Sequence, residues 1–470
     1  MRFAAAAAIN ATMSAAKQSF AVLTMLWALA SGAFAQLNEQ RQPVTNKDLL
    51  APWSPMETVL YTGATIHTVS GETLAPGFLL TRGAKIVSVS KTAPALKADR
   101  TVDLKGQHLF PGLILPTSSL GLTEINAVRA TQDTTETGTF TPDVRAWLAV
   151  NPDSELIPVA RANGITHALV LPLGGTVSGQ SGVISLAGWT MEEMTIAAPA
   201  ALHVFWPAMN LNVAPKELAR GAKGKSPEDQ AKDRTKRMKE LDDFFAEAQA
   251  YANARGVTLK DGKPAPKVPA WEALSPYLRR ELPLIVHAND ARQIKAALAW
   301  AAPHKYRIVI AGGRDAWRVA DELAAAKVPV IFESTFDQPI RDTDAYDAQF
   351  KGAALLHKAG VHVLFSEGPG ASGATFARNT PYAAAQAVAF GLPEAEALKG
   401  LTLYPAQVLG LDSRLGSLEV NKEATFFACD GHILDLRANV KRMWIAGREV
   451  SLDSRHTRLY EKYQARPAAK

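Results

Sequence analysis

Small hydroxyl side chains follow an apolar run in the segment HLFPGLILPTSSLGL, residues 108–122. The apolar residues give way to Thr117, Ser118 and Ser119, at the point where a buried strand would end. Side chains alternate along a strand, so Thr117 and Ser119 point to the same side. Neutral hydroxyls are poor metal ligands, but they can donate hydrogen bonds to a polar molecule and accept them. We take Thr117 and Ser119 as substrate-binding candidates.

Two ionisable side chains stand at the ends of other apolar runs. His287 lies in PLIVHAND (283–290), and Glu367 closes GVHVLFSE (360–367). An imidazole titrates near neutrality, and a carboxyl group in apolar surroundings has a raised pKa, so each could transfer a proton. His287 and Glu367 are therefore the catalytic candidates, with the neighbouring Asn289 as a substrate-binding residue. For His287, a hydrogen-bonded histidine of the core is the alternative.

A polar, glycine-rich segment, PLGGTVSGQSGV, spans residues 172–183. Consecutive glycine amides can bind an anion or a developing oxyanion. Gly174, Gly175, Ser178 and Gln180 are accordingly substrate-binding candidates. The segment lacks the Gly-Lys-Ser/Thr ending of a nucleotide-binding P-loop. A tight turn between two strands is the alternative interpretation.

Apolar strands joined through helices must position these residues. Seven runs are visible and an eighth strand is expected near 182–188; the seven lie at 108–116, 164–172, 201–207, 282–290, 306–313, 328–334 and 360–367. Continuous apolar strands that alternate with helical patterns indicate a parallel sheet covered on both faces. The fold class is therefore α/β, with a (β/α)8 TIM-like barrel over 108–410 as the prediction and an open doubly wound sheet as the alternative.

In such a barrel the site gathers where the strands end. The ends are expected at Thr117–Ser119, Pro172–Gly175, Trp206, His287–Asp290, Gly312–Gly313, Glu333–Ser334 and Glu367. A Ser118–His287–Asp290 triad has no Gly-x-Ser-x-Gly elbow to support it.

The sequence pattern at the two ends of the chain differs from that of the barrel region. Residues 57–107 and 411–455 read as short strands and glycine-bearing turns. Chain termini often lie close together, so we expect both parts to build one small β-sandwich, followed by a tail over 456–470. Between them, Ser226-Pro227 begins a helix whose apolar stripe includes Leu241 and Phe245.

The N-terminus predicts export. An apolar stretch over 19–35 follows Lys17 and closes with Ala33-Phe34-Ala35, which is typical of a cleaved signal peptide over 1–35, with Met13 as an alternative start to Met1. A membrane anchor is the other interpretation, but the stretch is short for a span. We expect a periplasmic protein without stable membrane insertion.

Composition narrows the class further. The chain has 470 residues, 47% of them hydrophobic, a formal net charge of +6 and a single cysteine, Cys429. One cysteine excludes an intramolecular disulfide and a thiolate cluster. The modest charge does not predict nucleic-acid binding.

Two segments resemble the amidohydrolase superfamily, close to its imidazolonepropionase-like group. They are LFPGLI (109–114), which follows the β-rich part, and ARNTPYAAAQAVAFGLPEAEALKGLTLYPAQVLGLDSRLGSLEVNKEA (377–424). The resemblance covers about 57–450. It implies a metal-dependent barrel that hydrolyses amide-like or other C–N bonds in small molecules.

The resemblance also implies a metal site that this sequence does not repeat. Thr117 and Ser119 stand where the family has a His-x-His pair, and Gly312 stands where it has a further histidine. His287 matches the family's middle-barrel histidine, and Glu367 lies near its late aspartate. We therefore predict a degraded metal centre with no metal ligands assigned, no tightly bound cofactor and at most one weakly held divalent metal.

Two functions are compatible with these residues. The first is an exported hydrolase-like protein that acts on C–N bonds other than peptide bonds in a small-molecule ligand. The second is a catalytically inactive binding or regulatory partner of an active amidohydrolase paralogue. Either function is compatible with a homo-oligomer or with a hetero-oligomer that contains such a paralogue.

Overall fold

The computed structural model describes residues 54–211, 225–254, 267–333 and 335–466. The expected signal peptide, Ser334 at one strand end, and residues 467–470 of the expected tail lie outside the described residues. The described residues belong to one compact unit that contains two eight-stranded sheets.

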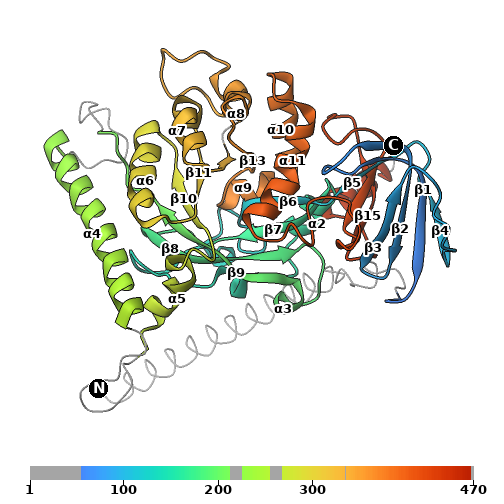
Figure 1. The fold of residues 1–470 in the computed structure, drawn as a ribbon, viewed down its shortest axis with the longest axis horizontal. Coiled ribbons are helices and arrows are strands. Elements are labelled where there is room, and N and C mark those ends of the chain that lie inside the picture. The colour runs from blue at the N-terminus through green and yellow to red at the C-terminus, as the bar shows by residue number, and fades with distance from the viewer. Residues whose placement is uncertain (1–53, 212–224, 255–266, 334, 467–470) are drawn as a thin grey trace, which may run out of the picture. The chain divides into compact units, whose positions relative to one another are not determined.

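The first sheet is the α/β barrel sheet, in which hydrogen-bonded neighbours follow chain order from β6 to β13 (Figure 1). Its strands are β6 (Leu113–Ser118), β7 (Ile165–Val170), β8 (Val177–Ser185), β9 (Thr195–Phe205), β10 (Leu284–Ala288), β11 (Ile308–Gly312), β12 (Val330–Phe332) and β13 (Val363–Phe365). A doubly wound sheet would reverse its strand order at a switch point, and this order contains no reversal. The last and first strands approach each other, since Ser366 Oγ donates to the Thr117 carbonyl at 2.8 Å. The sheet is therefore a nearly closed, TIM-like barrel.

The expectation of an all-parallel sheet is wrong at one strand. β8 pairs antiparallel with both β7 and β9, whereas the other neighbours in this sheet pair parallel. A parallel connection needs a crossover of about a dozen residues or more, and the link from Val170 to Val177 is shorter than that. As a result, β8 begins at the end of the barrel where β7 and β9 terminate.

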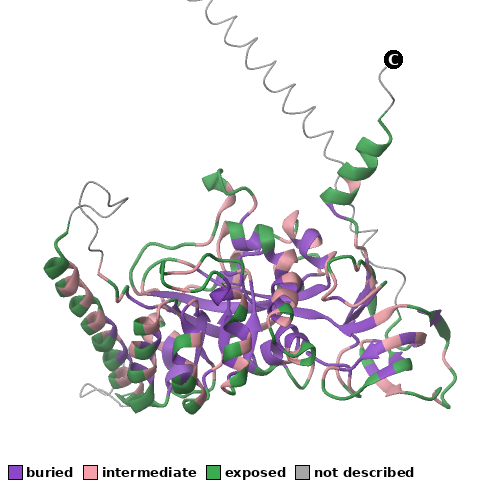
Figure 2. Ribbon diagram, turned by 90° about the horizontal axis from the view of Figure 1, so that it is seen from above, coloured by how far each residue is buried: buried purple, intermediate pink, exposed green. Residues whose placement is uncertain are grey.

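Helices cover the strands on the outside of the barrel (Figure 1). They are α2 (Leu156–Arg161), α3 (Met191–Met194), α4 (Pro227–Ala254), α5 (Pro269–Leu278), α6 (Ala291–His304), α7 (Ala320–Ala325), α8 (Ala348–Lys358), α9 (Ala371–Phe376), α10 (Thr380–Ala389), α11 (Glu394–Leu401) and α12 (Leu403–Val408). The last described helix, α13 (Arg455–Gln464), has no buried residue and projects from the body of the molecule (Figure 2). Short 3-10 turns lie at Arg129–Thr131, Ala146–Ala149, Ala316–Val319 and Ala377–Asn379. In α4, Leu241, Phe245 and Ala248 are buried along one stripe. None of the described helices combines the length and apolarity needed to cross a membrane.

The core of the barrel is aliphatic. Burial is concentrated on the strands and on the helix faces turned toward them (Figure 2). One buried cluster includes a side chain from each of the eight barrel strands, namely Ile114, Leu169, Val183, Ala201, Ile285, Val309, Ile331 and Leu364. Hydrocarbon packing of this kind supplies the main favourable free energy of folding.

The second sheet collects strands from both ends of the chain. Its order is β16-β15-β14-β5-β1-β2-β3, with β4 beside β1. The strands are β1 (Thr58–His67), β2 (Thr73–Arg82), β3 (Lys85–Ser90), β4 (Arg100–Asp103), β5 (His108–Pro111), β14 (Phe426–Cys429), β15 (Val440–Ile445) and β16 (Arg448–Val450). Tyr61 packs edge-on against Phe426 and Trp444 at 5.0 Å between ring centroids. That this sheet folds into a two-layered sandwich stays a prediction.

The LFPGLI motif links the two sheets. β5 ends at Pro111 in the second sheet, and β6 begins at Leu113 in the barrel. A Cβ on the intervening Gly112 would lie 2.2 Å from Thr166 Oγ1, so a side chain does not fit there. The motif therefore forms the junction between the two sheets and places Thr117 at the end of the first barrel strand.

Candidate functional site

The candidate site lies at the barrel mouth, which we define as the carboxyl ends of β6, β7 and β9–β13 together with the start of β8. The register aligns His287 with Ala311, Ala311 with Ile331, and Ile331 with Leu364. Aligned residues of neighbouring strands share one face, and the next residue on that face is two positions further along. Glu333 and Ser366 therefore lie on the same face as His287, one step closer to the mouth.

Thr117, Glu333 and Ser366 form a hydrogen-bonded cluster. Thr117 Oγ1 donates to Glu333 Oε1 at 2.5 Å and lies 2.9 Å from Ser366 Oγ. Ser366 Oγ donates to the Thr117 carbonyl and accepts from the Gly368 amide at 3.0 Å. A hydroxyl has one proton, so when Glu333 is ionised the Thr117 proton goes to the carboxylate. The cluster thus ties β6, β12 and β13 together through a carboxyl group.

Two carboxyl groups share this part of the mouth. Burial raises the pKa of Glu333 to about 7; the Thr117 hydrogen bond opposes this shift, and the charge of Glu367 adds to it. Burial also raises the pKa of Glu367 to about 7, and the charge of Asp337 contributes. Glu367 Oε1 is buried and has no hydrogen-bond partner among the described residues. Near neutral pH, such a pair contains both protonated and ionised carboxyl groups, as acid–base catalysis requires.

Glu333 Oε2 lies close to the backbone of Gly368. A Cβ added there would approach this oxygen to 3.2 Å, and Gly368 has a φ of +78°. Glycine at this position therefore leaves room for the carboxyl group.

His287 is paired with a second histidine. His203 Nδ1 and His287 Nε2 are 3.0 Å apart, and the Phe205 ring stacks on His287 at 4.1 Å between centroids. Burial lowers the pKa of His287 to about 3; burial and the neighbouring imidazole place the pKa of His203 well below its usual value. His287 retains a little exposed surface, but the atoms around it remove most of its hydration. Both rings are neutral at pH 7, so His287 is a weak proton acceptor.

The glycine-rich segment lies at the mouth, where β8 begins beside the end of β9. Its side chains bond to neighbouring backbone: Ser178 Oγ donates to the Pro172 carbonyl at 2.9 Å, and Gln180 Nε2 donates to the Pro142 carbonyl at 2.9 Å. Both residues are buried. Ser178 and Gln180 therefore hold the loops of the mouth in place.

Gly174 and Gly175 have φ values of +90° and +65°. A Cβ on Gly175 would lie 2.7 Å from the Thr139 carbonyl, so segment 138–141 packs directly over this turn. Beside this segment is a cavity of about 360 Å³ whose lining includes Asp133, Asp143 and Pro172.

The remaining candidates are divided between the two sides of the mouth. Ser119 is buried and its Oγ accepts from the Gly370 amide at 2.8 Å, which joins β6 to the loop after β13. Asn289 is exposed at the end of β10. Its side chain occupies the space beside Gly312, where an added Cβ would lie 2.5 Å from Asn289 Oδ1. The structure therefore brings Thr117 together with Glu333, and His287 together with His203.

The donor set does not fit a tightly bound transition metal. Among the described residues, no three His, Cys, Asp or Glu side chains converge on one point. One nitrogen of His287 is engaged by His203, and the Thr117 hydroxyl is engaged by Glu333. A tight site needs three or four converging nitrogen, sulfur or carboxylate ligands.

Glu333 and His203 are the site residues that sequence reasoning missed. Glu333 was recognisable as a strand end, and His203 stands two positions before Phe205 on one face of its strand. Their partners come from distant parts of the chain, so no local pattern showed the contacts.

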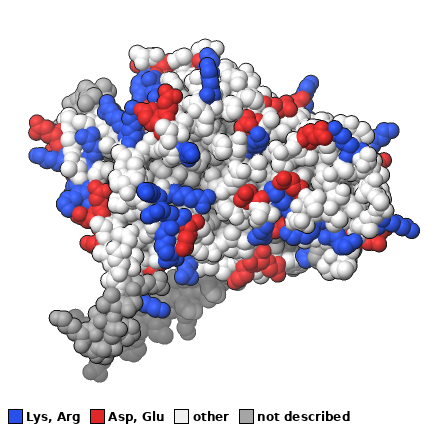
Figure 3. Space-filling model, in the orientation of Figure 1, with Lys and Arg blue, Asp and Glu red and all other residues white. Residues whose placement is uncertain are grey.

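Charged side chains are spread over the surface. In Figure 3, Lys and Arg side chains lie among Asp and Glu side chains, with one concentration of basic groups near the middle of the face shown. This distribution agrees with the modest net charge of +6.

Comparison with known proteins assigns the family. The model of the amidohydrolase family matches residues 188–450, which is more than half of the chain. The amidohydrolase tasK of Hapsidospora irregularis is 23% identical over 406 residues; the match covers 79% of this chain but 39% of that relative, so the chain spans about two fifths of its length.

Solved structures agree with this assignment. An amidohydrolase from Thermotoga maritima MSB8 is 27% identical, with a TM-score of 0.70, and the match covers 83% of this chain and 99% of that one. An adenosine deaminase from Xanthomonas campestris, solved with bound zinc, shares the fold at 16% identity and a TM-score of 0.50, over 88% and 98% of the two chains. The chain belongs to the amidohydrolase family.

Proposed function

We propose that this protein hydrolyses a C–N bond other than a peptide bond in a small molecule, and that the carboxyl pair Glu333–Glu367 transfers the protons. The observation that carries the proposal is the Thr117–Glu333 hydrogen bond of 2.5 Å, which holds one carboxyl group in the mouth within electrostatic range of another. Family membership and hydrolase neighbours support an enzyme, and they do not favour the inactive-partner alternative.

The chemistry follows from the two protonation states. Ionised Glu333, oriented by Thr117, accepts a proton from water as the water oxygen attacks the substrate carbon. Protonated Glu367 donates its proton to the departing nitrogen as the C–N bond breaks. The reaction consumes one water molecule. Glu333 has then gained a proton from the water, and Glu367 has lost a proton to the nitrogen. A proton transfer from Glu333 to Glu367 restores the starting state.

The other candidates bind and orient the substrate in this proposal. Neutral His287 and the stacked Phe205 present a flat surface on one side of the mouth. Exposed Asn289 offers an amide for hydrogen bonds, and the Gly174–Gly175 turn supports the loop opposite. In this proposal His287 binds the substrate and does not transfer the proton, because its low pKa makes it a weak base.

The finer parts of the assignment belong to the same proposal. They are membership of the imidazolonepropionase-like group, replacement of the His-x-His pair by Thr117 and Ser119, export to the periplasm after cleavage of residues 1–35, and at most one weakly held divalent metal. The replacement is supported by the hydrogen bonds that engage Thr117 and Ser119.

A substrate screen followed by variants tests the proposal. The full chain is incubated with cyclic amides and N-acyl amino acids, and products are followed by mass spectrometry. Glu333→Gln and Glu367→Gln should each lower kcat/KM about 100-fold or more, because each removes a proton-transfer group. Glu247→Gln, on the exposed face of α4, is the matched control and should leave kcat/KM unchanged. Full activity in Glu333→Gln would refute the proposal.

A further inference from the structure

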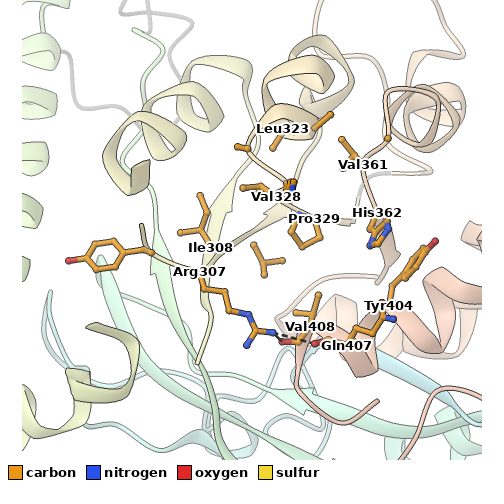
Figure 4. A pocket seen from close by; sticks show the side chains of 16 residues that line it. Arg307, Ile308, Leu323, Val328, Pro329, Val361, His362, Tyr404, Gln407 and Val408 are labelled. Carbon is orange, nitrogen blue, oxygen red and sulfur yellow. Dashed lines mark hydrogen bonds between the residues drawn. The ribbon is translucent and has the colours of Figure 1, made fainter. Parts of the chain in front are cut away.

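A second cavity, of about 490 Å³, lies at the opposite ends of the strands that carry Glu333 and Ser366. Its lining includes Arg307, Pro329 and His362, each of which immediately precedes β11, β12 or β13. Tyr404 and Val408 of α12 close another side (Figure 4). The candidate site follows the carboxyl ends of β12 and β13, so the cavity is separated from it by the length of these strands.

The cavity combines apolar walls with an aromatic surface. Ile308, Val328 and Pro329 line one side. The rings of His362 and Tyr404 stack at 4.2 Å between centroids with an interplanar angle of 8°, and Tyr404 is fixed by its hydroxyl, which donates to Glu396 Oε2 at 2.5 Å. A fixed aromatic surface beside aliphatic walls suits the apolar body of a ligand.

The charge of the cavity is positive. Its described lining residues include Arg307 and Lys327 but no Asp or Glu. Neither cation forms an ion pair with a carboxylate among the described residues, and both are exposed. Arg307 Nη2 donates to the Val408 and Gln407 carbonyls at 2.8 and 3.3 Å, which holds the guanidinium at the cavity (Figure 4). Other donors of this guanidinium could bind an oxyanion.

We propose that this cavity binds a small organic carboxylate with an aromatic or aliphatic body. The carboxylate lies at Arg307 and Lys327, and the body packs against the His362–Tyr404 stack. The volume lies within the range of about 300–1,000 Å³ that is typical of small-molecule pockets. An inorganic anion would leave the apolar walls uncovered.

The test uses 3-phenylpropionate and its uncharged analogue 3-phenylpropan-1-ol as probes, titrated against the full chain by saturation-transfer NMR. The carboxylate should bind saturably, with a Kd of about 1 mM or tighter for a ligand of this size. The alcohol should bind at least about fivefold more weakly, because it lacks the charge. Absence of saturable carboxylate binding up to about 10 mM would refute the proposal.

Variants locate the binding. Arg307→Gln should weaken carboxylate binding about tenfold, and Arg307→Lys should recover part of this loss. Ala326→Trp, at an exposed lining position, should block both probes. Lys232→Gln, on the exposed surface of α4, and Glu333→Gln, in the mouth, should leave Kd unchanged. Unchanged binding in Ala326→Trp, or loss of binding in Glu333→Gln, would overturn the assignment to this cavity.

Discussion

Thr117 and Glu333 are 216 residues apart in the chain, and they meet at 2.5 Å across the barrel mouth. The partner of this hydroxyl is thus a carboxyl group. Burial of Glu333 favours its protonated form, and the hydrogen bond from Thr117 favours its ionised form. A histidine at this position could ligate a metal ion, whereas threonine tunes the acidity of Glu333. A hydroxyl at this position thus fits proton transfer by a buried carboxyl group.

Thr117→Val should shift the pH dependence of activity. The Thr117 hydrogen bond lowers the pKa of Glu333, so its removal lets this pKa rise further above its ordinary value. The acidic limb of the kcat/KM profile, which reports ionisation of the general base, should then move to higher pH. Thr117→Ser retains the hydroxyl and should leave the limb in place. Identical limbs in Thr117→Val and the parent would contradict the proposed role.

Glu333→Gln should change stability in a pH-dependent way. The carboxyl has a pKa of about 7 in the folded state and an ordinary value of 4.5 in the unfolded chain, so the folded state holds the extra proton between these pH values. The parent therefore loses stability relative to Glu333→Gln as pH rises from 4.5 to 7, by up to about 3 kcal/mol. Denaturant unfolding at pH 5 and pH 8 measures this difference, with Glu247→Gln as the control. An equal effect of Glu333→Gln at both pH values would show that the folded pKa is near normal.

Much of the fold could be predicted because its signals are local. Apolar runs marked the barrel strands, and the stripe containing Leu241 and Phe245 marked the buried face of α4. The direction of β8 was missed although a local signal existed: the link from Val170 to Val177 is too short for a crossover. The length of the connection predicts the direction of this strand better than its apolar sequence does.

The site was harder to predict because its properties depend on distant contacts. Thr117, His287 and Glu367 could be selected as polar residues at strand ends. The raised pKa of Glu333 depends on burial and on Glu367, and the neutrality of His287 depends on burial. Sequence spacing carries neither quantity, so it gave no reason to prefer Glu333 to His287 as a proton-transfer group.

Purified protein should hold well under one tightly bound zinc, iron or manganese per chain after dialysis. The ligands that a transition metal needs are engaged elsewhere or missing, since His287 pairs with His203 and Gly312 has no side chain. Activity found in the substrate screen should also survive treatment with a chelator. Elemental analysis is the measurement. A stoichiometric metal that survives dialysis would return the protein to metal-dependent hydrolysis.

Gly312→Ala should destabilise the mouth for two separable reasons. Gly312 has a φ of +90°, which disfavours a side chain, and an added Cβ would lie 2.5 Å from Asn289 Oδ1. Gly106 has a φ of +78° but open space around it, so Gly106→Ala measures the backbone contribution alone, which we expect to be about 1 kcal/mol. Gly312→Ala should lower the free energy of unfolding by about 1–3 kcal/mol more than this control does, since the clash is added. Combining it with Asn289→Ala should remove the excess and leave the backbone part. If the double variant is no more stable than Gly312→Ala, the clash with the Asn289 side chain is not the cause of the extra destabilisation. The Asn289 side chain would then not lie beside Gly312, and another position in the mouth would have to be assigned to it.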